Sequence, residues 1–259
     1  MAANSIQETM DLALVAHLAT LKYKVPFLSF FDGFRTSHEV AKIEELTDED
    51  IRTMITADMV SGHRGRAMTP DRPELRGTAQ NPDAFFQARE AVSPFYEACP
   101  AAVARTMDRF AALTGRQYKF AEEYKLDDAD MVMVMLGSSA GTAKDVIDEY
   151  REKGVKVGLL KLRMFRPFPA EQLVPVLAGR KAIAVLDRSA SFGGWGGPVF
   201  TEIRSALYGQ PNPAPLANWI YGLGGRDFEL HHAAEVIDAM QTMASGGEVP
   251  TLNLLGCRA

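Results

Sequence analysis

The sequence contains few cysteines, with Cys99 and Cys257 as its two. Iron–sulfur clusters are usually held by four cysteine thiolates, so this chain alone supplies too few ligands for one. The two cysteines also lie too far apart in sequence for the Cys-x-x-Cys spacing of zinc and redox sites. Scarce cysteines are typical of proteins in a reducing compartment, and we expect a cytoplasmic location.

Long apolar runs are also absent. No segment approaches the roughly 20 apolar residues needed to cross a bilayer. The first apolar stretch, residues 12–21, is amphipathic and predicts no signal peptide. The net charge is small, at -5, which excludes a general attraction to nucleic acid or to acidic membrane surfaces. We therefore expect a soluble protein that binds neither nucleic acid nor membrane.

Apolar strands and helices alternate in the second half of the chain. Strands are predicted at residues 131–136, 155–160, 182–186 and 219–221, with helices between them. Continuous apolar strands that alternate with helices are typical of a parallel sheet covered on both faces. Because chains of 259 residues often divide into two cores, we predict two domains that meet between residues 118 and 119.

The first half is rich in helical signals. A capping box at Ser5 predicts a helix near the start of the chain. Frequent glycine and proline leave residues 60–82 with little room for regular structure. A long helical region is predicted at residues 84–113, with interruptions near Pro94 and Pro100.

Residues 25–31 form an apolar run that ends at Asp32 and Gly33. A run of this length, with proline near its start and Asp-Gly at its end, predicts a buried strand that leads into a turn. Open α/β sheets place their ligand sites where a strand's carboxyl end meets the next helix. The polar residues that follow this run are therefore in a position typical of a functional site.

Arg35, Thr36 and His38 are the candidate residues in this polar stretch, either at an active site or at a subunit interface. An arginine can bind a substrate carboxylate or an acidic side chain of a partner with two parallel hydrogen bonds. The alternative is local: Thr36 caps a helix, and Arg35 pairs with Asp32 or Glu39.

Two other stretches suit anionic ligands. Four arginines, Arg64, Arg66, Arg72 and Arg76, fall within one short segment. Coenzyme A or an acidic partner surface would suit this basic cluster, while a solvated loop with local salt bridges is the alternative. Residues 137–141 lie between a strand and a helix, where backbone amides can hold an anion, although a tight turn with a helix cap is the favoured explanation. The glycines of residues 193–197 and 222–225 predict close backbone packing.

Several unusual strings occur in the order found in one enzyme family. They are Phe-Leu-Ser-Phe-Phe-Asp-Gly-Phe-Arg-Thr-Ser-His-Glu (27–39), Arg-Gly-Thr-Ala-Gln-Asn-Pro-Asp (76–83), Arg-Pro-Phe-Pro (166–169), Leu-Asp-Arg-Ser (186–189) and Tyr-Gly-Leu-Gly-Gly-Arg-Asp (221–227). Together they resemble the alpha subunit of pyruvate:ferredoxin oxidoreductase and its 2-oxoacid:ferredoxin oxidoreductase relatives, which use thiamine diphosphate.

The resemblance implies an α/β fold class. Residues 1–118 are expected to be the C-terminal part of a thiamine-diphosphate pyrimidine-binding domain. Residues 119–259 are expected to form a transketolase C-terminal-like, mostly parallel α/β domain. In that family further strands and helices precede the position of Ala2, and they carry the acidic residue that contacts the thiamine pyrimidine. We therefore expect a C-terminal fragment of an alpha subunit, with sheet edges left unpaired.

The resemblance also implies a reaction: oxidative decarboxylation of a 2-oxoacid, expected to be pyruvate, to acetyl-CoA with reduction of ferredoxin in anaerobic metabolism. Thiamine diphosphate with Mg²⁺ is expected to be shared with a partner beta subunit, and coenzyme A is the co-substrate. Iron–sulfur clusters are expected only in partner subunits, which include a gamma and a ferredoxin-like delta subunit. The alternative function is a doubly wound module that binds coenzyme A or a nucleotide without redox chemistry, centred on residues 137–227.

Overall fold

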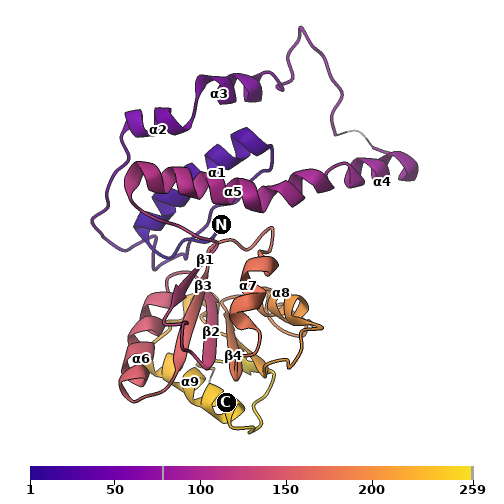
Figure 1. Ribbon diagram of the computed structural model, residues 1–259. Helices are drawn as coiled ribbons and strands as arrows, with labels where there is room; N and C mark the ends of the chain where they lie inside the picture. The colour runs from indigo at the N-terminus through magenta and orange to yellow at the C-terminus, as the bar shows by residue number, and fades with distance from the viewer. Residues whose placement is uncertain (78, 258–259) are drawn as a thin grey trace. The chain divides into compact units, whose positions relative to one another are not determined.

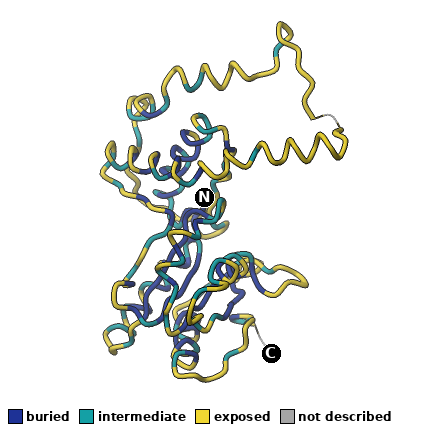
Figure 2. The backbone as a smooth tube through the Cα atoms, turned by 45° about the vertical axis from the view of Figure 1, so that its right-hand side comes forward, coloured by how far each residue is buried: buried dark blue, intermediate teal, exposed yellow. Residues whose placement is uncertain are grey.

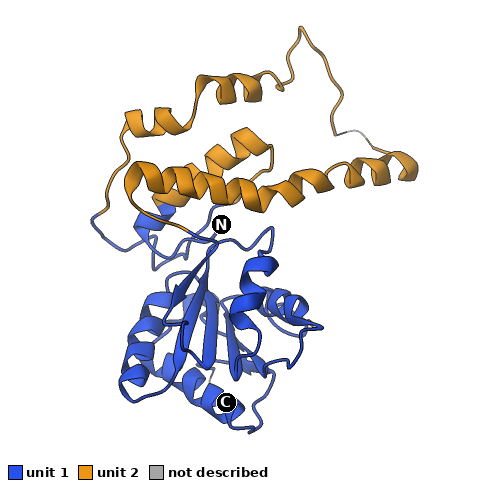
Figure 3. Cartoon of the chain, in the orientation of Figure 1, with its two compact units in different colours: residues 1–9, 29–42, 119–259 blue, residues 10–28, 43–118 orange. Residues whose placement is uncertain are grey.

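The computed structural model describes residues 1–77 and 79–257, and the chain divides into two compact units. Residues 1–9, 29–42 and 119–259 form the first, which we call the α/β unit (Figure 3). The second, which we call the helical unit, consists of residues 10–28 and 43–118. The predicted domain boundary between residues 118 and 119 stays a prediction. Two short N-terminal segments lie with the C-terminal residues in the α/β unit.

The α/β unit contains a six-stranded sheet in the order β1-β3-β2-β4-β5-β6. The strands are β1 (Ala121–Tyr124), β2 (Met131–Leu136), β3 (Val157–Leu162), β4 (Ala182–Asp187), β5 (Leu216–Ile220) and β6 (Leu252–Leu254). The edge strand β1 is antiparallel to β3, and all the other pairs are parallel. The predicted α/β class with a mostly parallel sheet is thus confirmed.

Helices cover both faces of this sheet (Figure 1). On one face α6 (Ala140–Glu152) and α9 (Leu230–Ala244) pack in a single core with Met131, Met133 and Met135 of β2. On the other face α7 (Ala170–Leu177) and α8 (Pro198–Leu207) pack in a second core with the intervening valines of β2. Successive side chains of a strand point to opposite faces, so a continuously apolar strand supplies both cores.

The helical unit contains most of α1 (Ile6–Tyr23), together with α2 (Asp48–Met54), α3 (Ala57–Arg64), α4 (Pro82–Glu90) and α5 (Ser93–Thr114). Its buried side chains come mainly from α1 and α5, whereas α3 and α4 bury none (Figure 2). Within the residues that the structure describes, no helix is both long and apolar enough to cross a membrane.

The predicted strand at residues 25–31 is wrong. The segment is extended but forms one isolated parallel bridge, between Phe30 and Ala2. The Phe30 amide donates to the Met1 carbonyl at 3.0 Å, and the Ala3 amide donates to the Phe30 carbonyl at 2.9 Å. A strand needs a hydrogen-bonded neighbour along its length, and Phe30 is the residue of this segment for which a described bridge exists.

The predicted interruption near Pro100 is also wrong, because α5 continues through this residue. Proline in a helix removes one hydrogen bond to the carbonyl four residues earlier, here that of Tyr96. Tyr96 lies on the exposed side of α5, where water can satisfy its carbonyl. The break predicted near Pro94 is present, since α4 ends at Glu90 and α5 begins at Ser93.

Candidate functional site at the carboxyl ends of the central strands

The chain reverses its direction of winding between β2 and β4. From β2 it continues to β3 on one side of the sheet, and then to β4 on the other side. In open α/β sheets this reversal leaves a crevice at the carboxyl ends of the two strands, and ligands commonly bind there. The residues that directly follow these strands are Gly137 and Arg188.

The side chain of Asp32 lies at this point of reversal. Its Oδ2 accepts a hydrogen bond from the Ser138 amide at 2.5 Å, and Arg188 Nη1 lies 3.2 Å from its Oδ1. The carboxylate is 13% exposed and the Arg188 side chain 25%. A backbone amide before a helix and a guanidinium group are a favourable combination for an anion. The structure fills this anion site with a carboxylate of the same chain.

Two glycines make this arrangement possible. Gly137 has φ +79°, and a Cβ atom there would stand 2.6 Å from Asp32 Oδ2. Gly222, which follows β5, has φ +64°, and a Cβ atom would stand 2.9 Å from Arg188 Nε. Both positions combine a left-handed backbone with a lack of space, so glycine is required for both reasons. The prediction of close backbone packing at residues 222–225 is confirmed at Gly222.

Tyr221 lies beneath this group of charges, and its side chain is fully buried. Burial raises the pKa of Tyr221 to about 12, while a hydrogen bond with Ser139 and the nearby Arg188 act in the opposite direction. The phenol therefore stays protonated at neutral pH. It contributes a neutral polar group just after the carboxyl end of β5.

Asp187, the last residue of β4, has a structural role. Its carboxylate accepts hydrogen bonds from the amides of Val199 at 2.9 Å and Phe200 at 3.1 Å, at the start of α8. Burial raises the pKa of Asp187, although these bonds and one from Asn218 oppose the change. A Cβ atom at Gly197 would stand 2.3 Å from the Asp187 Cγ. The glycine-rich stretch before α8 thus serves close packing, as predicted.

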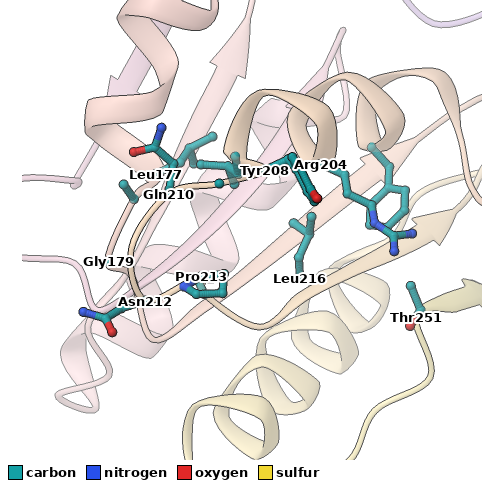
Figure 4. A pocket seen from close by; sticks show the side chains of 14 residues that line it. Leu177, Gly179, Arg204, Tyr208, Gln210, Asn212, Pro213, Leu216 and Thr251 are labelled. Atoms are coloured by element: carbon teal, nitrogen blue, oxygen red, sulfur yellow. The ribbon is translucent and has the colours of Figure 1, made fainter.

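A pocket of about 280 Å³ adjoins the Asp32 carboxylate. It is lined by Ala2, Ala3, Phe30, Phe31, Asp32, Leu136, Gly137, Phe165, Leu186, Asp187, Arg188, Ser189, Pro198 and Val199. Most of these residues are apolar, and the charged ones are Asp32, Asp187 and Arg188. A second pocket of about 390 Å³ lies at the opposite, amino ends of β4 and β5, beside Arg204 and Tyr208 (Figure 4).

The candidate residues Arg35, Thr36 and His38 all lie in one turn, residues 33–38, directly after Asp32. Arg35 is exposed, and the partner of Asp32 is Arg188, so the alternative pairing of Arg35 with Asp32 does not form. His38 Nδ1 lies 2.8 Å from the Ser37 hydroxyl, and its ring stacks on that of Phe34. Their role in a site stays a prediction.

Thr36 is 4% exposed, and its hydroxyl has no hydrogen-bond partner within the described residues. Residues 39–47, all of them described, form no helix, so Thr36 does not cap one. A buried hydroxyl without a partner is costly, and in proteins such groups usually meet a ligand or water. Thr36 is therefore the residue of the turn whose buried hydroxyl lacks a hydrogen-bond partner.

The basic cluster lies in the helical unit and is exposed. Arg76 pairs with Glu74 at 2.5 Å, and it also donates to the Arg66 carbonyl at 2.8 Å. Arg66 in turn donates to the Gly62 carbonyl at 2.8 Å. For Arg66 and Arg76 these contacts favour the alternative of a solvated loop with local pairs.

A second group of charges ties the N-terminal residues to the sheet. Lys161 Nζ lies 2.8 Å from Glu8 Oε1 and 2.7 Å from Glu122 Oε2. Arg163 contacts the same two carboxylates, each at 2.6 Å, and Lys144 pairs with Glu122. Burial alone would raise the pKa of Glu122, but hydrogen bonds from Lys144 and Lys161 lower it to about 2. Glu122 is thus ionised at neutral pH.

Sequence reasoning missed Asp32 and Arg188 as a pair. They are 156 residues apart in sequence, and no local pattern joins them. The available signals were indirect: Asp32 directly follows an apolar run, and Arg188 follows another after Asp187. The ends of such runs are where a parallel sheet gathers its polar side chains.

Comparisons with known proteins agree with this architecture. The family model "Pyruvate flavodoxin/ferredoxin oxidoreductase, thiamine diP-binding" matches residues 1–108. The model "Pyruvate:ferredoxin oxidoreductase core domain II" matches residues 129–233. The chain belongs to the pyruvate:ferredoxin oxidoreductase family. The resemblance inferred from the sequence strings is therefore confirmed.

Relatives in this family are similar along most of the chain. A pyruvate-flavodoxin oxidoreductase from Rhodospirillum rubrum is 48% identical over 250 residues, which cover 93% of this chain and 21% of that protein. The pyruvate:ferredoxin oxidoreductase of Moorella thermoacetica is 46% identical over 235 residues, which cover 90% of this chain and 20% of that protein. The chain thus spans about a fifth of the length of these curated relatives.

A solved structure also shares the fold. The 2-oxoglutarate:ferredoxin oxidoreductase from Magnetococcus marinus, with 2-oxoglutarate, coenzyme A and succinyl-CoA bound, matches with a TM-score of 0.54 at 14% identity. The match covers 93% of this chain and 41% of that one. At this identity the likeness concerns the fold alone.

The described residues do not by themselves fit thiamine diphosphate with its metal ion. Within residues 1–77 and 79–257, no group of three or more His, Cys, Asp or Glu side chains is arranged to hold a metal. Asp32, the carboxylate at the strand ends, is already bound to Ser138 and Arg188. We therefore derive no step through this cofactor from the residues of this chain.

Proposed function

We propose that this chain is one part of a thiamine-diphosphate-dependent 2-oxoacid:ferredoxin oxidoreductase, with pyruvate as the substrate. In this reaction pyruvate loses CO₂, the coenzyme A sulfur gives up its proton and accepts the acetyl group, and two electrons pass to ferredoxin. The main support is the identity of 45–48% with enzymes named for pyruvate, over 90% or more of the chain. The order of the two family models, thiamine diphosphate-binding first and core domain II second, agrees with it.

The role of the chain in this enzyme is to position the turn at residues 33–38. Asp32 fixes the start of this turn on the strand ends through Ser138 and Arg188. The exposed Arg35 and His38 and the unsatisfied hydroxyl of Thr36 then face the substrate or a neighbouring subunit. Arginine suits the carboxylate of a 2-oxoacid, because it can form two parallel hydrogen bonds with it.

The cofactors are held mainly by other parts of the enzyme. Thiamine diphosphate with Mg²⁺ is shared with a beta subunit or its fused equivalent, which supplies the metal ligands. The iron–sulfur clusters lie in partner polypeptides, since this chain has two cysteines, far fewer than the clusters require. Coenzyme A is the co-substrate, as in the structural neighbour that contains it. Cys99 is a free, buried cysteine, which is consistent with a cytoplasmic location.

The partners are the other segments of the same oxidoreductase, as beta, gamma and ferredoxin-like delta subunits or fused to one another, together with ferredoxin. Four aromatic side chains of α4 and α5 are 45% exposed or more: Phe85, Phe86, Phe95 and Tyr96. Aromatic residues are enriched at the cores of interfaces. Because the curated relatives are about five times longer, we propose that these other segments cover the four exposed aromatic side chains.

The alternative of a module that binds coenzyme A or a nucleotide at its strand ends has less support. Such a module needs a vacant crevice where the winding reverses. Here the amide of Ser138 and the guanidinium of Arg188 are engaged by Asp32. A phosphate group would have to displace this carboxylate before it could bind.

The experiment is to tag this chain in its own host, isolate it with its native partners, and measure the reduction of a viologen dye. We expect reduction that requires pyruvate, coenzyme A and thiamine diphosphate together. A faster reaction with 2-oxoglutarate would overturn the assignment of pyruvate but keep the reaction class. No reduction with any 2-oxoacid, from a preparation that contains the iron–sulfur partners, would contradict the proposed function.

A further inference from the structure

The crevice of a doubly wound sheet is usually the place of a ligand that arrives from solution. In this chain the corresponding groups hold a side chain of residues 29–42, the segment that carries the candidate turn. Asp32 is separated in sequence from Ser138 by 106 positions and from Arg188 by 156 positions. The segment itself has little other regular structure, since one isolated bridge and the turn are its described elements.

We propose that the Ser138 amide and Arg188 form a binding site for a carboxylate anion, and that Asp32 is its permanent ligand, which locks residues 29–42 to the carboxyl ends of β2 and β4. The site has one amide donor and one guanidinium donor, on opposite oxygens of the carboxylate. Asp32 is thus a positioning residue for Arg35, Thr36 and His38.

Two glycines bring the carboxylate and the guanidinium close to the backbone. Both Asp32 oxygens stand within 2.8 Å of the place where a Gly137 Cβ would be, so the carboxylate lies directly against the glycine backbone. The Arg188 side chain is itself confined, because it lies against the backbone of Gly222. The carboxylate and the guanidinium are thus confined by backbone on the side of these two glycines.

Removal of the carboxylate should leave a vacancy that a small anion can fill. In Asp32→Ala we expect the melting temperature of the full chain to fall by roughly 5 °C, as for the loss of one partly buried ion pair from a chain of this size. Sodium acetate should recover at least half of this loss at a concentration where sodium chloride of equal ionic strength does not. The wild-type chain should show no such difference between the two salts.

Trypsin gives a second readout, because Arg35 is exposed in the turn that Asp32 holds. Cleavage after Arg35 should become at least fivefold faster in Asp32→Ala and slow again with acetate. Cleavage after Arg64, an exposed arginine in the helical unit, is the internal control and should not change. Asp71→Ala is the matched control variant, since Asp71 is an exposed aspartate without a role in this contact.

The outcomes separate the proposal from its alternatives. The double variant Asp32→Ala/Arg188→Gln should lose the acetate response, because the guanidinium donor is gone. A stronger response to inorganic phosphate than to acetate would overturn the assignment of a carboxylate site. Equal responses to acetate in Asp32→Ala and the wild-type chain would overturn the site itself.

A second substitution covers the case in which Asp32→Ala does not fold. Asp32→Asn keeps the shape and one acceptor oxygen but loses the charge. We expect a lower melting temperature, faster cleavage after Arg35 and no acetate response, since the amide still fills the space. A variant indistinguishable from wild type in both readouts would contradict the proposal, because the ion pair with Arg188 would then hold nothing in place.

Discussion

The two units of this chain differ in how completely they bury their own apolar residues. In the α/β unit every residue of β3 and β4 is buried, and both faces of the sheet are covered by the chain's own helices. In the helical unit α3 and α4 bury no residue. Apolar area removed from water is the main source of stability. The α/β unit therefore buries its apolar strands with its own helices. The helical unit instead presents surface that other parts of the enzyme are proposed to cover.

The largest effect on this comparison should come from Glu8→Ala in the α/β unit. This change leaves the buried Lys161 and Arg163 with one carboxylate fewer, and breaking a buried ion pair costs about 3 kcal/mol. The matched control is Arg52→Ala in the helical unit, whose pair with Asp48 is mostly exposed and contributes about 0.5 kcal/mol or less. Urea unfolding monitored by circular dichroism measures both. Equal effects would mean that the buried cluster does not hold the N-terminal residues.

Two glycines with the same backbone conformation provide the second comparison. Gly137 in the α/β unit and Gly115 in the helical unit have φ of +79° and +74°. Nothing lies within 4 Å of a Cβ atom at Gly115, so Gly115→Ala should cost about 1 kcal/mol from the backbone alone. Gly137→Ala should cost about 3 kcal/mol, because the methyl group also displaces Asp32. Similar losses in chemical denaturation would show that Asp32 does not press on Gly137.

Acid should destabilise the α/β unit through Glu122. Its pKa is lowered from 4.5 to about 2 in the folded chain, so the folded state favours the ionised form. This contribution is complete above pH 4.5 and is lost as the pH falls toward 2. The free energy of unfolding, measured by urea titration between pH 5 and pH 3, should decrease less steeply in Glu122→Gln. An unchanged slope would contradict the assigned pairing with Lys144 and Lys161.

The smallest effect on stability should come from Phe86→Ser in the helical unit. Phe86 is 74% exposed, so the free energy of unfolding of the chain alone should change by about 0.5 kcal/mol or less. Recovery of the native partners with the tagged chain should nevertheless fall at least threefold. Gln87→Ser, an exposed change on the same helix, is the control and should leave recovery unchanged. Unchanged recovery with Phe86→Ser would show that another surface makes the contact.

The sequence predicted the parts of the fold that local patterns determine. The continuous apolar runs of β2 and β4 and the helices between them could be read directly, because their side chains face two cores. The strands β1 and β6 were missed because they have four and three residues and are largely not buried. The Asp-Gly pair at residues 32–33 predicted a turn, and a turn is present at residues 33–38, but its anchor was not predicted. The partner of Asp32 depends on the strand order, which no single segment encodes.

Hydrogen–deuterium exchange tests the contrast between the two units most directly. It would be measured on the full chain alone and in its native complex. The account predicts that amides of β2 and β4 are strongly protected in both samples. Amides of α4 should exchange rapidly in the chain alone and at least tenfold more slowly in the complex. Protection of α4 equal to that of β2 in the chain alone, or an unchanged rate for α4 in the complex, would contradict it.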